Sequence, residues 1–442
     1  MIHVRLWALP ICHSFYTNRL VSMNTSNTSL SPTLPAERVF SGLSMASLWF
    51  SLGVGLLVIQ VGAYLVPAMG TKEAFWAILV GSILGSGLLA WTAKLGCDSG
   101  LSSAGLMHHV YGPGFARLPV ILNIVQLVGW TTFELVIMRD GTHAILLKAL
   151  GADISPLWST LLWGLVLVTL MMGSMLTLVR KFVSRVGLPL VVLSLLWLTW
   201  HFVGVLQVQG TEAFLSRTGT GEMGMLSAID LVIAMPVSWL PLVADYARHA
   251  KAGNTTFKGT WVGYALANAW CYALGVLVVS VSAPDTDLVN ALLLAQGGLL
   301  ALGLILLDEI DNAYGDIYSG AVSAHSLQPS VSVRHLGMGL ALLCTALAVV
   351  LPMHELEPFL LTLSSVFIPL YGVIMGRMGS GQAQQPNKTD KTEKSFNVSA
   401  ALIWMVGIVV FHASAHYTPE YGSTLPSLAF TFLLSWVTRK KA

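Results

Sequence analysis

Charged side chains are scarce in this chain. Asp, Glu, Lys and Arg make up 10% of its 442 residues, and hydrophobic residues make up 55%. A soluble domain carries about 25% charged residues. Apolar windows of about 20 residues, the length that an α-helix needs to cross a bilayer, recur along most of the sequence. The composition therefore predicts an all-α polytopic membrane protein, because a membrane β-barrel would show short alternating segments instead.

The motifs of several other protein classes are also missing. The four cysteines lie at Cys12, Cys97, Cys271 and Cys344. Their spacing fits neither a metal site nor a disulfide framework. Basic patches with interleaved aromatic residues are absent, so we expect no nucleic-acid partner. The pair His108-His109 is more typical of a solvated cytoplasmic loop than of a metal site, and we expect no cofactor beyond a coupling ion.

Twelve membrane-spanning helices are predicted, and the stretches between them are too short for a soluble domain. Their approximate bounds are 44–68, 73–95, 118–139, 157–179, 186–208, 227–247, 259–282, 298–324, 333–352, 357–376, 397–415 and 423–438. We expect residues 1–37 to be a disordered tail, with Met23 as an alternative start. Residues 379–395 are predicted to be a polar cytoplasmic linker before the last two spans and the basic C-terminus (396–442).

Lys and Arg set the predicted orientation. With the N-terminus in the cytoplasm, all of them fall on the inner side except Lys72, Arg139, Lys148 and Arg217. This bias follows the positive-inside rule, and the even number of spans places both termini in the cytoplasm. We expect a multi-pass protein of a bacterial cytoplasmic (inner) membrane, in contact with the lipid bilayer and functional as a monomer.

The stretch LLDEIDNAYGDIYSG (306–320) carries four carboxylates. They are Asp308, Glu309, Asp311 and Asp316. A span that ended at Leu307 would leave them in a cytoplasmic loop. Gly297-Gly298 would interrupt that span, so we favour a short outer helix over 285–296 and a span over 298–324, with the acids near mid-depth.

Acids inside a bilayer need a purpose. Each costs about 2.5–3.5 kcal/mol at the bilayer centre if it is charged and unpaired. Asp308, Asn312, Asp316 and Ser319 share one helix face, which should line the interior of the bundle. Such a stripe is typical of an ion or proton path.

Two spans carry signs of interruption. Span 1 (SLGVGLLVIQVGAYLVP) contains three glycines and a lone Gln60, and span 6 (AMPVSWLPLVADYARHA) contains Pro236 and Pro241. Pro removes a helical N–H and clashes with the preceding turn. Membrane helices tolerate single Gly and Pro residues. Interruptions five spans apart, however, predict an inverted-repeat transporter with its site at the breaks.

Span 3 contains QLVGWTTFELVIMRDG (126–141). Trp130 and Glu134 are four residues apart, so they share a helix face. A Trp ring can stack on a flat heteroaromatic molecule, and a carboxylate can accept N–H bonds from its edge. The pair therefore suits an aminopyrimidine.

These stretches resemble the nucleobase:cation symporter-1 family, in particular its CytX-type branch of hydroxymethylpyrimidine or purine–cytosine permeases. The segments SWLPLVADYAR (238–248), GWTTFE (129–134) and DIYSGAVS (316–323) are similar to its motifs in spans 6, 3 and 8. The similarity runs from about residue 38 to 438 and includes VFIPLYGVIMG (366–376). It implies a LeuT-like 5+5 inverted repeat, with halves at 38–208 and 226–378, followed by two C-terminal helices.

The resemblance also implies roles for single residues. Trp130 would stack on one face of the base, and Trp239 would be a second aromatic plate. Glu134, Gln60 and Gly62 would complete the substrate site, the last two in the interrupted part of span 1. From its position further along span 8, we expect Asp316 to lie nearer the substrate than the other acids.

For the coupling ion, sodium in family relatives is held by span-1 carbonyls and by small hydroxyl side chains on span 8. This chain has Asp308, Glu309, Asp311 and Asn312 in that region. The departure leaves sodium and proton coupling both open.

The sequence thus predicts a secondary transporter that imports a pyrimidine-type nucleobase or the thiamine precursor hydroxymethylpyrimidine. An amino-acid or amine transporter on the same fold is the first alternative. An intramembrane enzyme is the second, although the chain lacks HExxH and DDxxD motifs.

Overall fold

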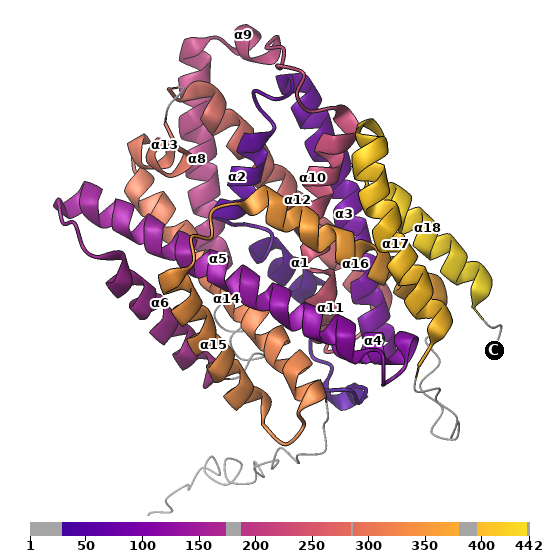
Figure 1. The fold of residues 1–442 in the computed structure, drawn as a ribbon. Coiled ribbons are helices and arrows are strands. Elements are labelled where there is room, and N and C mark those ends of the chain that lie inside the picture. Colours follow the sequence, from indigo (N-terminus) through magenta and orange to yellow (C-terminus); the bar gives the residue numbers. More distant parts are fainter. Residues whose placement is uncertain (1–28, 174–186, 284–285, 380–395, 440–442) are drawn as a thin grey trace, which may run out of the picture.

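The computed structural model describes residues 29–173, 187–283, 286–379 and 396–439 (Figure 1). The predicted spans correspond to α1 (Gly42–Ser51) with α2 (Leu56–Tyr64), α3 (Thr71–Ser99), α5 (Arg117–Leu150), α6 (Pro156–Met171), α8 (Leu188–Gln209), α10 (Met225–Ser238) with α11 (Leu240–Ala247), α12 (Gly253–Val281), α14 (Gly298–Leu327), α15 (Val333–Val350), α16 (Leu356–Met378), α17 (Val398–Tyr417) and α18 (Thr424–Thr438). Shorter helices are α4 (Ser103–Tyr111), α9 (Thr211–Leu215) and α13 (Leu288–Leu294). Single 3₁₀ turns lie at Pro35–Glu37 and Pro419–Tyr421.

The predicted fold class is confirmed. In the described part of the chain, 8 helices are long and apolar enough to cross a membrane, or 9 when the bent pair α1–α2 is taken as one span. The rest of the expected twelve are α6 and α18, which are apolar but shorter, and α14, which carries the acids. The tail before residue 29 and the linker 380–395 lie outside the described residues.

Helix α14 decides between the two readings of the acidic stretch. It begins at Gly298, after the short helix α13, as the preferred reading predicts. Asp308, Glu309, Asp311 and Asp316 are between 1% and 9% exposed. The alternative that leaves them in a solvated loop is therefore wrong.

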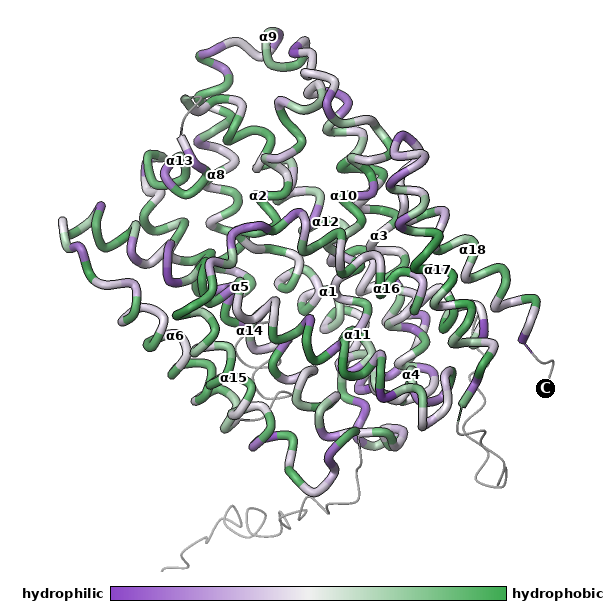
Figure 2. The backbone as a smooth tube through the Cα atoms, in the orientation of Figure 1, coloured by the Kyte–Doolittle hydropathy of each residue, from purple (hydrophilic) through white to green (hydrophobic). Residues whose placement is uncertain are grey.

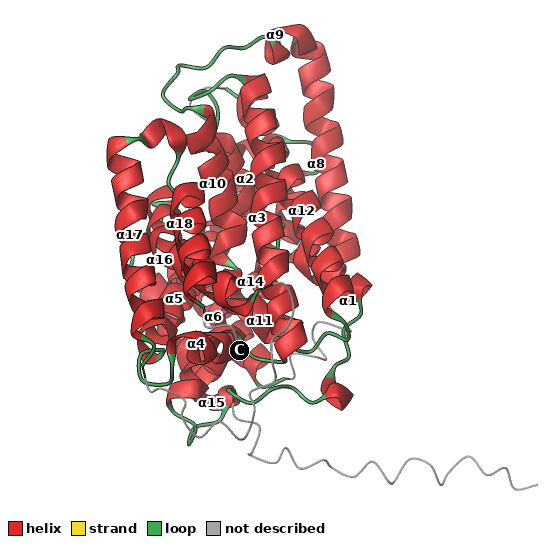
Figure 3. Cartoon of the chain, turned by 90° about the vertical axis from the view of Figure 1, so that its right-hand side faces the viewer, coloured by secondary structure: helices red, strands yellow, loops and turns green. Residues whose placement is uncertain are grey.

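The exterior of the bundle is apolar, as a lipid-facing surface requires. Large exposed apolar side chains project from α6, α8, α15, α17 and α18, among them Leu161, Leu165, Leu193, Trp200, Leu342, Leu402, Val409 and Leu433. Hydrophobic segments run along these outer helices in Figure 2. Figure 3 shows the long helices side by side, with α17 and α18 on one flank.

Two expectations about helix limits were wrong. The span predicted over 118–139 continues in α5 to Leu150, and the helix ends only where Gly151 adopts a φ of +62°. The stretch between spans 2 and 3, expected to be a loop, contains α4, so His108 and His109 lie on a helix.

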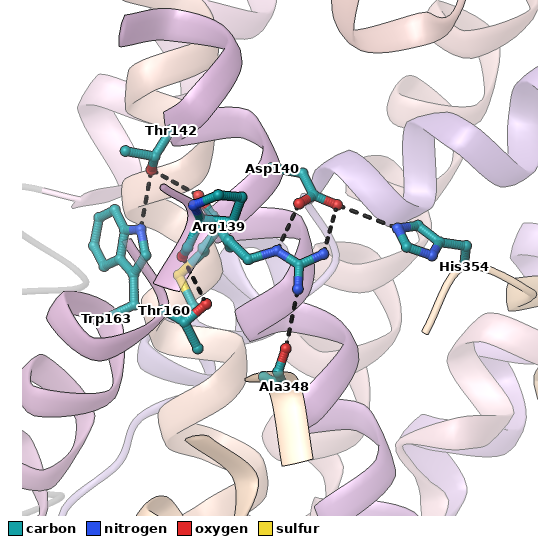
Figure 4. A network of polar contacts seen from close by, with 9 residues as sticks. Arg139, Asp140, Thr142, Thr160, Trp163, Ala348 and His354 are labelled. Carbon is teal, nitrogen blue, oxygen red and sulfur yellow. Dashed lines mark hydrogen bonds and ion pairs between the residues drawn. The ribbon is translucent and has the colours of Figure 1, made fainter. Parts of the chain in front are cut away.

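Helix α5 extends beyond its predicted end because its polar residues find partners inside the protein (Figure 4). Arg139 Nε lies 2.6 Å from Asp140 Oδ1, and Arg139 Nη1 donates to Ala348 O of α15 at 3.0 Å. Asp140 Oδ2 also lies 3.2 Å from His354 Nε2, just before α16. Trp163 Nε1 of α6 donates to Thr142 Oγ1 at 3.0 Å. Charge in this segment therefore ties helices together and does not mark the end of one.

The predicted interruptions differ in strength. Span 1 is broken over residues 52–55, and α1 and α2 meet at 64°. Span 6 is interrupted only at Trp239, whose φ of −85° and ψ of −10° remain helical, so α10 and α11 form one span. Pro241 lies in the first turn of α11, where a missing N–H costs little. The expectation of a clear break in span 6 is thus wrong.

Helix α12 packs backbone to backbone on both halves of span 1. A Cβ atom added to Gly259 would lie 2.2 Å from Gly42 O, and one added to Gly263 would lie 2.3 Å from Ala46 O, both on α1. A Cβ atom added to Gly275 would lie 2.0 Å from Ile59 O on α2. Only glycine permits these approaches, so α12 fixes where both half-helices lie.

Candidate functional site

The break in span 1 lies against the acidic face of α14. Glu309 Oε1 accepts a hydrogen bond from Leu56 N at 2.6 Å, at the first residue of α2. Asn312 Nδ2 donates to Val54 O at 3.3 Å and to Glu309 Oε2 at 3.1 Å. The break leaves backbone groups without helical partners. Side chains of α14 therefore supply those partners.

One turn away, a hydroxyl group bridges two further acids. Ser51 Oγ lies 3.0 Å from Asp308 Oδ1 and 2.9 Å from Asp311 Oδ2. A hydroxyl has a single proton to donate. Two short contacts therefore mean that this proton is shared, or that one carboxyl group carries a proton and donates it to Ser51. In the described part of the chain, no Lys or Arg pairs with either acid.

A small cavity lies beside this cluster, between four segments of the bundle. It is lined by Trp130 and Glu134 of α5, by Leu52, Gly55, Leu57 and Val58 of span 1, by Met235, Ser238 and Trp239 of span 6, and by Glu309, Asn312 and Asp316 of α14. The remaining space admits little more than a water molecule. A heteroaromatic ring would enter only if these walls moved apart.

The two tryptophans are held by other aromatic rings. Trp130 lies edge-on to Phe359 of α16, with ring centroids 5.1 Å apart. Trp239 lies edge-on to Trp49 of α1 at 5.9 Å. Such T-shaped contacts are favourable. The indole rings therefore have fixed places on two sides of the cavity.

Some polar groups of the cavity lack partners. Glu134 Oε2 and Trp130 Nε1 are buried and make no hydrogen bond within the described residues. Asp316 is 2% exposed, and no hydrogen bond or ion pair to it is formed there. Buried polar groups without partners are uncommon in proteins, and a bound ligand is one explanation.

The predicted substrate residues separate into two groups. Trp130, Glu134, Trp239 and Asp316 line the cavity together. Gln60 and Gly62 do not line the cavity. Both lie within α2, so the expectation that they fall in the interrupted part of span 1 is wrong.

Both residues have other roles in the packing. Gln60 Nε2 donates to Tyr64 Oη at 2.7 Å. A Cβ atom added to Gly62 would lie 2.3 Å from Tyr272 O. Gly62 therefore allows α2 and α12 to pack closely and does not expose its backbone to a substrate.

The predicted ion-coupling residues also separate. Glu309 and Asn312 reach both the span-1 break and the cavity, whereas Asp308 and Asp311 contact Ser51. Ser51 was missed by the sequence analysis, although a hydroxyl two residues before Gly53 was a usable signal. Gly55 was considered only as one of the three glycines of span 1. Ser238 is the first residue of the 238–248 motif, and Met235 lies three residues before it.

A membrane bundle with a buried polar cavity at an interrupted span has the organisation of a secondary transporter. A family of permeases for cytosine/purines, uracil, thiamine and allantoin matches residues 32–438. The chain belongs to this permease family, which confirms the resemblance seen in the sequence. It is a family of transporters and not of enzymes.

Individual relatives are distant. The chain is 24% identical over 347 residues to purine-cytosine permease FCY2 of Saccharomyces cerevisiae, covering 71% of this chain and 62% of that protein. It is 30% identical over 110 residues to purine-uracil permease NCS1 of Arabidopsis thaliana, covering 25% and 18%. It is 23% identical over 277 residues to the S. cerevisiae vitamin B6 transporter TPN1, covering 61% and 40%. The chain thus matches less than two thirds of the length of each.

Solved structures share the fold. Mhp1, a nucleobase-cation-symport-1 family transporter in a closed conformation with bromovinylhydantoin bound, superposes with a TM-score of 0.80 at 17% identity, covering 93% of this chain and 95% of Mhp1. Its inward-facing conformation gives 0.74 at 16% identity, covering 93% and 92%. A Na⁺-coupled sialic acid symporter gives 0.62 at 11% identity, covering 91% and 90%.

Proposed function

We propose that this protein imports a pyrimidine-type base by alternating access, coupled to sodium or protons. The cavity lined by Trp130, Glu134, Trp239 and Asp316 carries the proposal. It combines two aromatic side chains with unpartnered carboxylates, which suits a flat molecule with N–H groups on its edge. The names of the relatives, which include a purine-cytosine permease and a purine-uracil permease, support a nucleobase.

Hydroxymethylpyrimidine ranks ahead of cytosine as substrate. Both carry an amino group that can donate a hydrogen bond to Glu134. The resemblance of the sequence to the CytX-type branch favours hydroxymethylpyrimidine. The cavity must open before either enters, since it now admits little more than water. That requirement supports alternating access, in which a closed site opens to one side at a time.

The coupling ion belongs to the α14 face beside the cavity. Glu309 and Asn312 contact both the span-1 break and the cavity. Ion binding at the break would therefore alter the cavity, and substrate binding in the cavity would alter the break. Asp308 and Asp311 continue the polar face through Ser51. We place the coupling site among these four side chains, in a monomer whose termini both face the cytoplasm of a bacterial cell.

Uptake into proteoliposomes tests the function. Radiolabelled hydroxymethylpyrimidine, cytosine and leucine would be supplied with a sodium gradient, with a proton gradient and with neither. We expect accumulation of the two bases under one of the gradients and none of leucine. Leucine accumulation without transport of any base would replace the proposal with an amino-acid transporter.

A further inference from the structure

Helix α2 begins without a capping side chain of its own. Its N-cap residue is Gly55, and its first turn contains no acidic residue. The N–H of Ile59 is the first that bonds back along the helix, to Gly55 O at 3.2 Å. The N–H groups of Leu56, Leu57 and Val58 therefore need partners outside the helix. The last two of these residues line the cavity.

A helix end of this kind attracts anions. Its N–H groups and the helix dipole give it a partial positive charge, and carboxylates and phosphates bind at such ends. Among the described residues that line the cavity, none is Lys, Arg or His. The N-terminus of α2 is therefore the feature of this site that would receive the carboxylate of an anionic substrate.

A carboxylate of the chain itself already takes this position. Glu309 Oε1 accepts Leu56 N at 2.6 Å, and Glu309 Oε2 accepts Asn312 Nδ2 at 3.1 Å. Both oxygens thus face N–H donors, which suits an ionised carboxylate. A Cβ atom added to Gly55 would lie 2.8 Å from Glu309 Oε1. The glycine that leaves α2 without a cap therefore also makes room for the carboxylate from α14.

We propose that Glu309 determines substrate specificity as a tethered anion, which occupies the N-terminus of α2 and so excludes substrates that carry a carboxylate. The inference rests on the proposed function and narrows its substrates to uncharged or cationic heterocycles. It also opposes the amino-acid alternative, because an amino acid would bring a second carboxylate to the same N–H groups.

An anionic substrate would have to displace Glu309, and two effects oppose this. Glu309 is attached to α14, so its effective concentration at the helix end is higher than that of a dissolved substrate. Once displaced, its carboxylate would remain buried in a cavity that Glu134 and Asp316 also line. A buried charge without a partner is costly. An uncharged ring can bind without displacing Glu309 at all.

A matched pair of ligands tests the specificity. Hydroxymethylpyrimidine would be compared with the same ring carrying a carboxylate in place of the hydroxymethyl group, by calorimetry on the purified full-length protein. We expect the carboxylate to bind the wild type at least about 100-fold more weakly, because like charges meet in the cavity. In Glu309→Ala this gap in affinity should narrow by about 10- to 100-fold, the contribution of a hydrogen bond between the carboxylate and the freed N–H groups.

Two further variants separate the position of the charge from its presence. Glu134→Gln removes a carboxylate from the same cavity but frees no N–H of α2, so it should narrow the gap less than Glu309→Ala. Glu309→Gln retains an oxygen near Leu56 and should lie between the wild type and Glu309→Ala. Gel filtration would show whether each variant is folded, and Glu309→Gln carries the test if Glu309→Ala is not.

The helix end can also be probed without a substrate. Formate, added at constant ionic strength, should raise the melting temperature of Glu309→Ala, because it refills the position of the lost carboxylate. The wild type should show no such rise. Glu212→Ala is the matched control, since Glu212 is exposed on α9 and its loss frees no N–H of α2.

Three outcomes would overturn the inference and leave the proposed function standing. They are equal affinity of the wild type for the two ligands, equal narrowing of the gap in Glu134→Gln and Glu309→Ala, and an unchanged gap in the folded Glu309 variants. If the protein binds neither hydroxymethylpyrimidine nor cytosine, the proposed function itself fails. The formate measurement then decides the inference separately, and a melting temperature of Glu309→Ala that formate leaves unchanged would disprove it.

Discussion

Glu309 accepts the backbone N–H of Leu56 at 2.6 Å, so one α14 carboxylate caps the half-helix that begins after the break in span 1. Glu309→Ala would leave that N–H without an acceptor, and we expect a loss of about 1–3 kcal/mol in stability. Glu309→Gln retains an amide oxygen and should lose less. Thermal unfolding in detergent, compared with wild type, measures both.

The matched control for this prediction is Glu212→Ala. Glu212 lies on the short helix α9, away from the cavity, and its side chain is exposed. Equal melting temperatures for the wild type and Glu309→Ala would show that the cap contributes nothing. A lower melting temperature for Glu212→Ala than for Glu309→Ala would point to general sensitivity to lost acids.

The Ser51 bridge predicts a specific transport defect. Neutralising an acid that carries the coupling ion should abolish accumulation against a gradient, yet leave exchange of internal for external substrate. We therefore expect Asp308→Asn and Asp311→Asn to retain counterflow and to lose gradient-driven uptake. Normal accumulation in both variants would remove these acids from the coupling site.

Span 6 gives a prediction about access. Ser238 and Trp239 line the cavity, so cysteine at either position should react with a small thiol reagent when the cavity opens. Saturating substrate should slow that reaction. Leu266 is exposed on the outer face of α12 and provides a lipid-facing comparison. If cysteines at positions 238 and 239 never react, and Leu at either position leaves transport unchanged, then span 6 is an ordinary packed helix.

The close packing of α12 predicts which glycines can change. Gly275→Ala would place a Cβ atom 2.0 Å from Ile59 O. Overpacking of this kind costs about 1–3 kcal/mol. A Cβ atom added to Gly339 of α15 would meet nothing within 4 Å. Gly339→Ala should therefore be neutral or stabilising by up to about 1 kcal/mol. Thermal stability of the two variants makes the comparison, and equal values would contradict the proposed contact.

A pH effect on stability follows from His249, just beyond the end of α11. Its carbonyl accepts Val39 N at 2.7 Å and Phe40 N at 3.0 Å, which ties the N-terminal segment to span 6. Burial, together with the neighbouring Arg248, lowers the pKa of His249 to about 3 from 6.5. Between pH 6.5 and about 3, His249 is therefore protonated in the unfolded chain and neutral in the folded protein.

Stability should consequently fall as the pH drops below 6.5 towards about 3, by up to about 1.4 kcal/mol per pH unit from this group. His249→Gln removes the titration and should flatten the lower part of the curve. Melting temperatures over this range measure it. Identical pH profiles for wild type and variant would show that His249 is accessible to protons in the folded protein.

Much of the fold could be predicted from the sequence because lipid imposes simple rules. Apolar length marks a span, and Gly297-Gly298 correctly separates α13 from α14. The rules failed where protein replaces lipid as the surroundings. Helix α5 passes its predicted end because Arg139 bonds Ala348 O and Asp140 contacts His354, partners more than 200 residues away that the local sequence does not report.

The candidate site was predicted in part for a similar reason. Trp130 and Glu134 are four residues apart on one helix, so their common face could be read from spacing, and both line the cavity. Gln60 was assigned to the site because it is a lone polar residue in an apolar span. Its side chain instead donates a hydrogen bond to Tyr64, one turn later in α2. Ser51 and Asp308 are 257 residues apart. Their contact depends on tertiary packing that no local pattern contains.

The glycine contacts of α12 also limit how the protein can move. Helix α12 packs against both pieces of span 1, so its contacts oppose bending at the 64° elbow between them. The contacts to α14 are different, because hydrogen bonds such as Glu309–Leu56 and Ser51–Asp308 can be exchanged for water or an ion. The sliding plane of the transport cycle is therefore expected between the rigid unit α1–α2–α12 and α14, which puts the acids on the moving boundary itself.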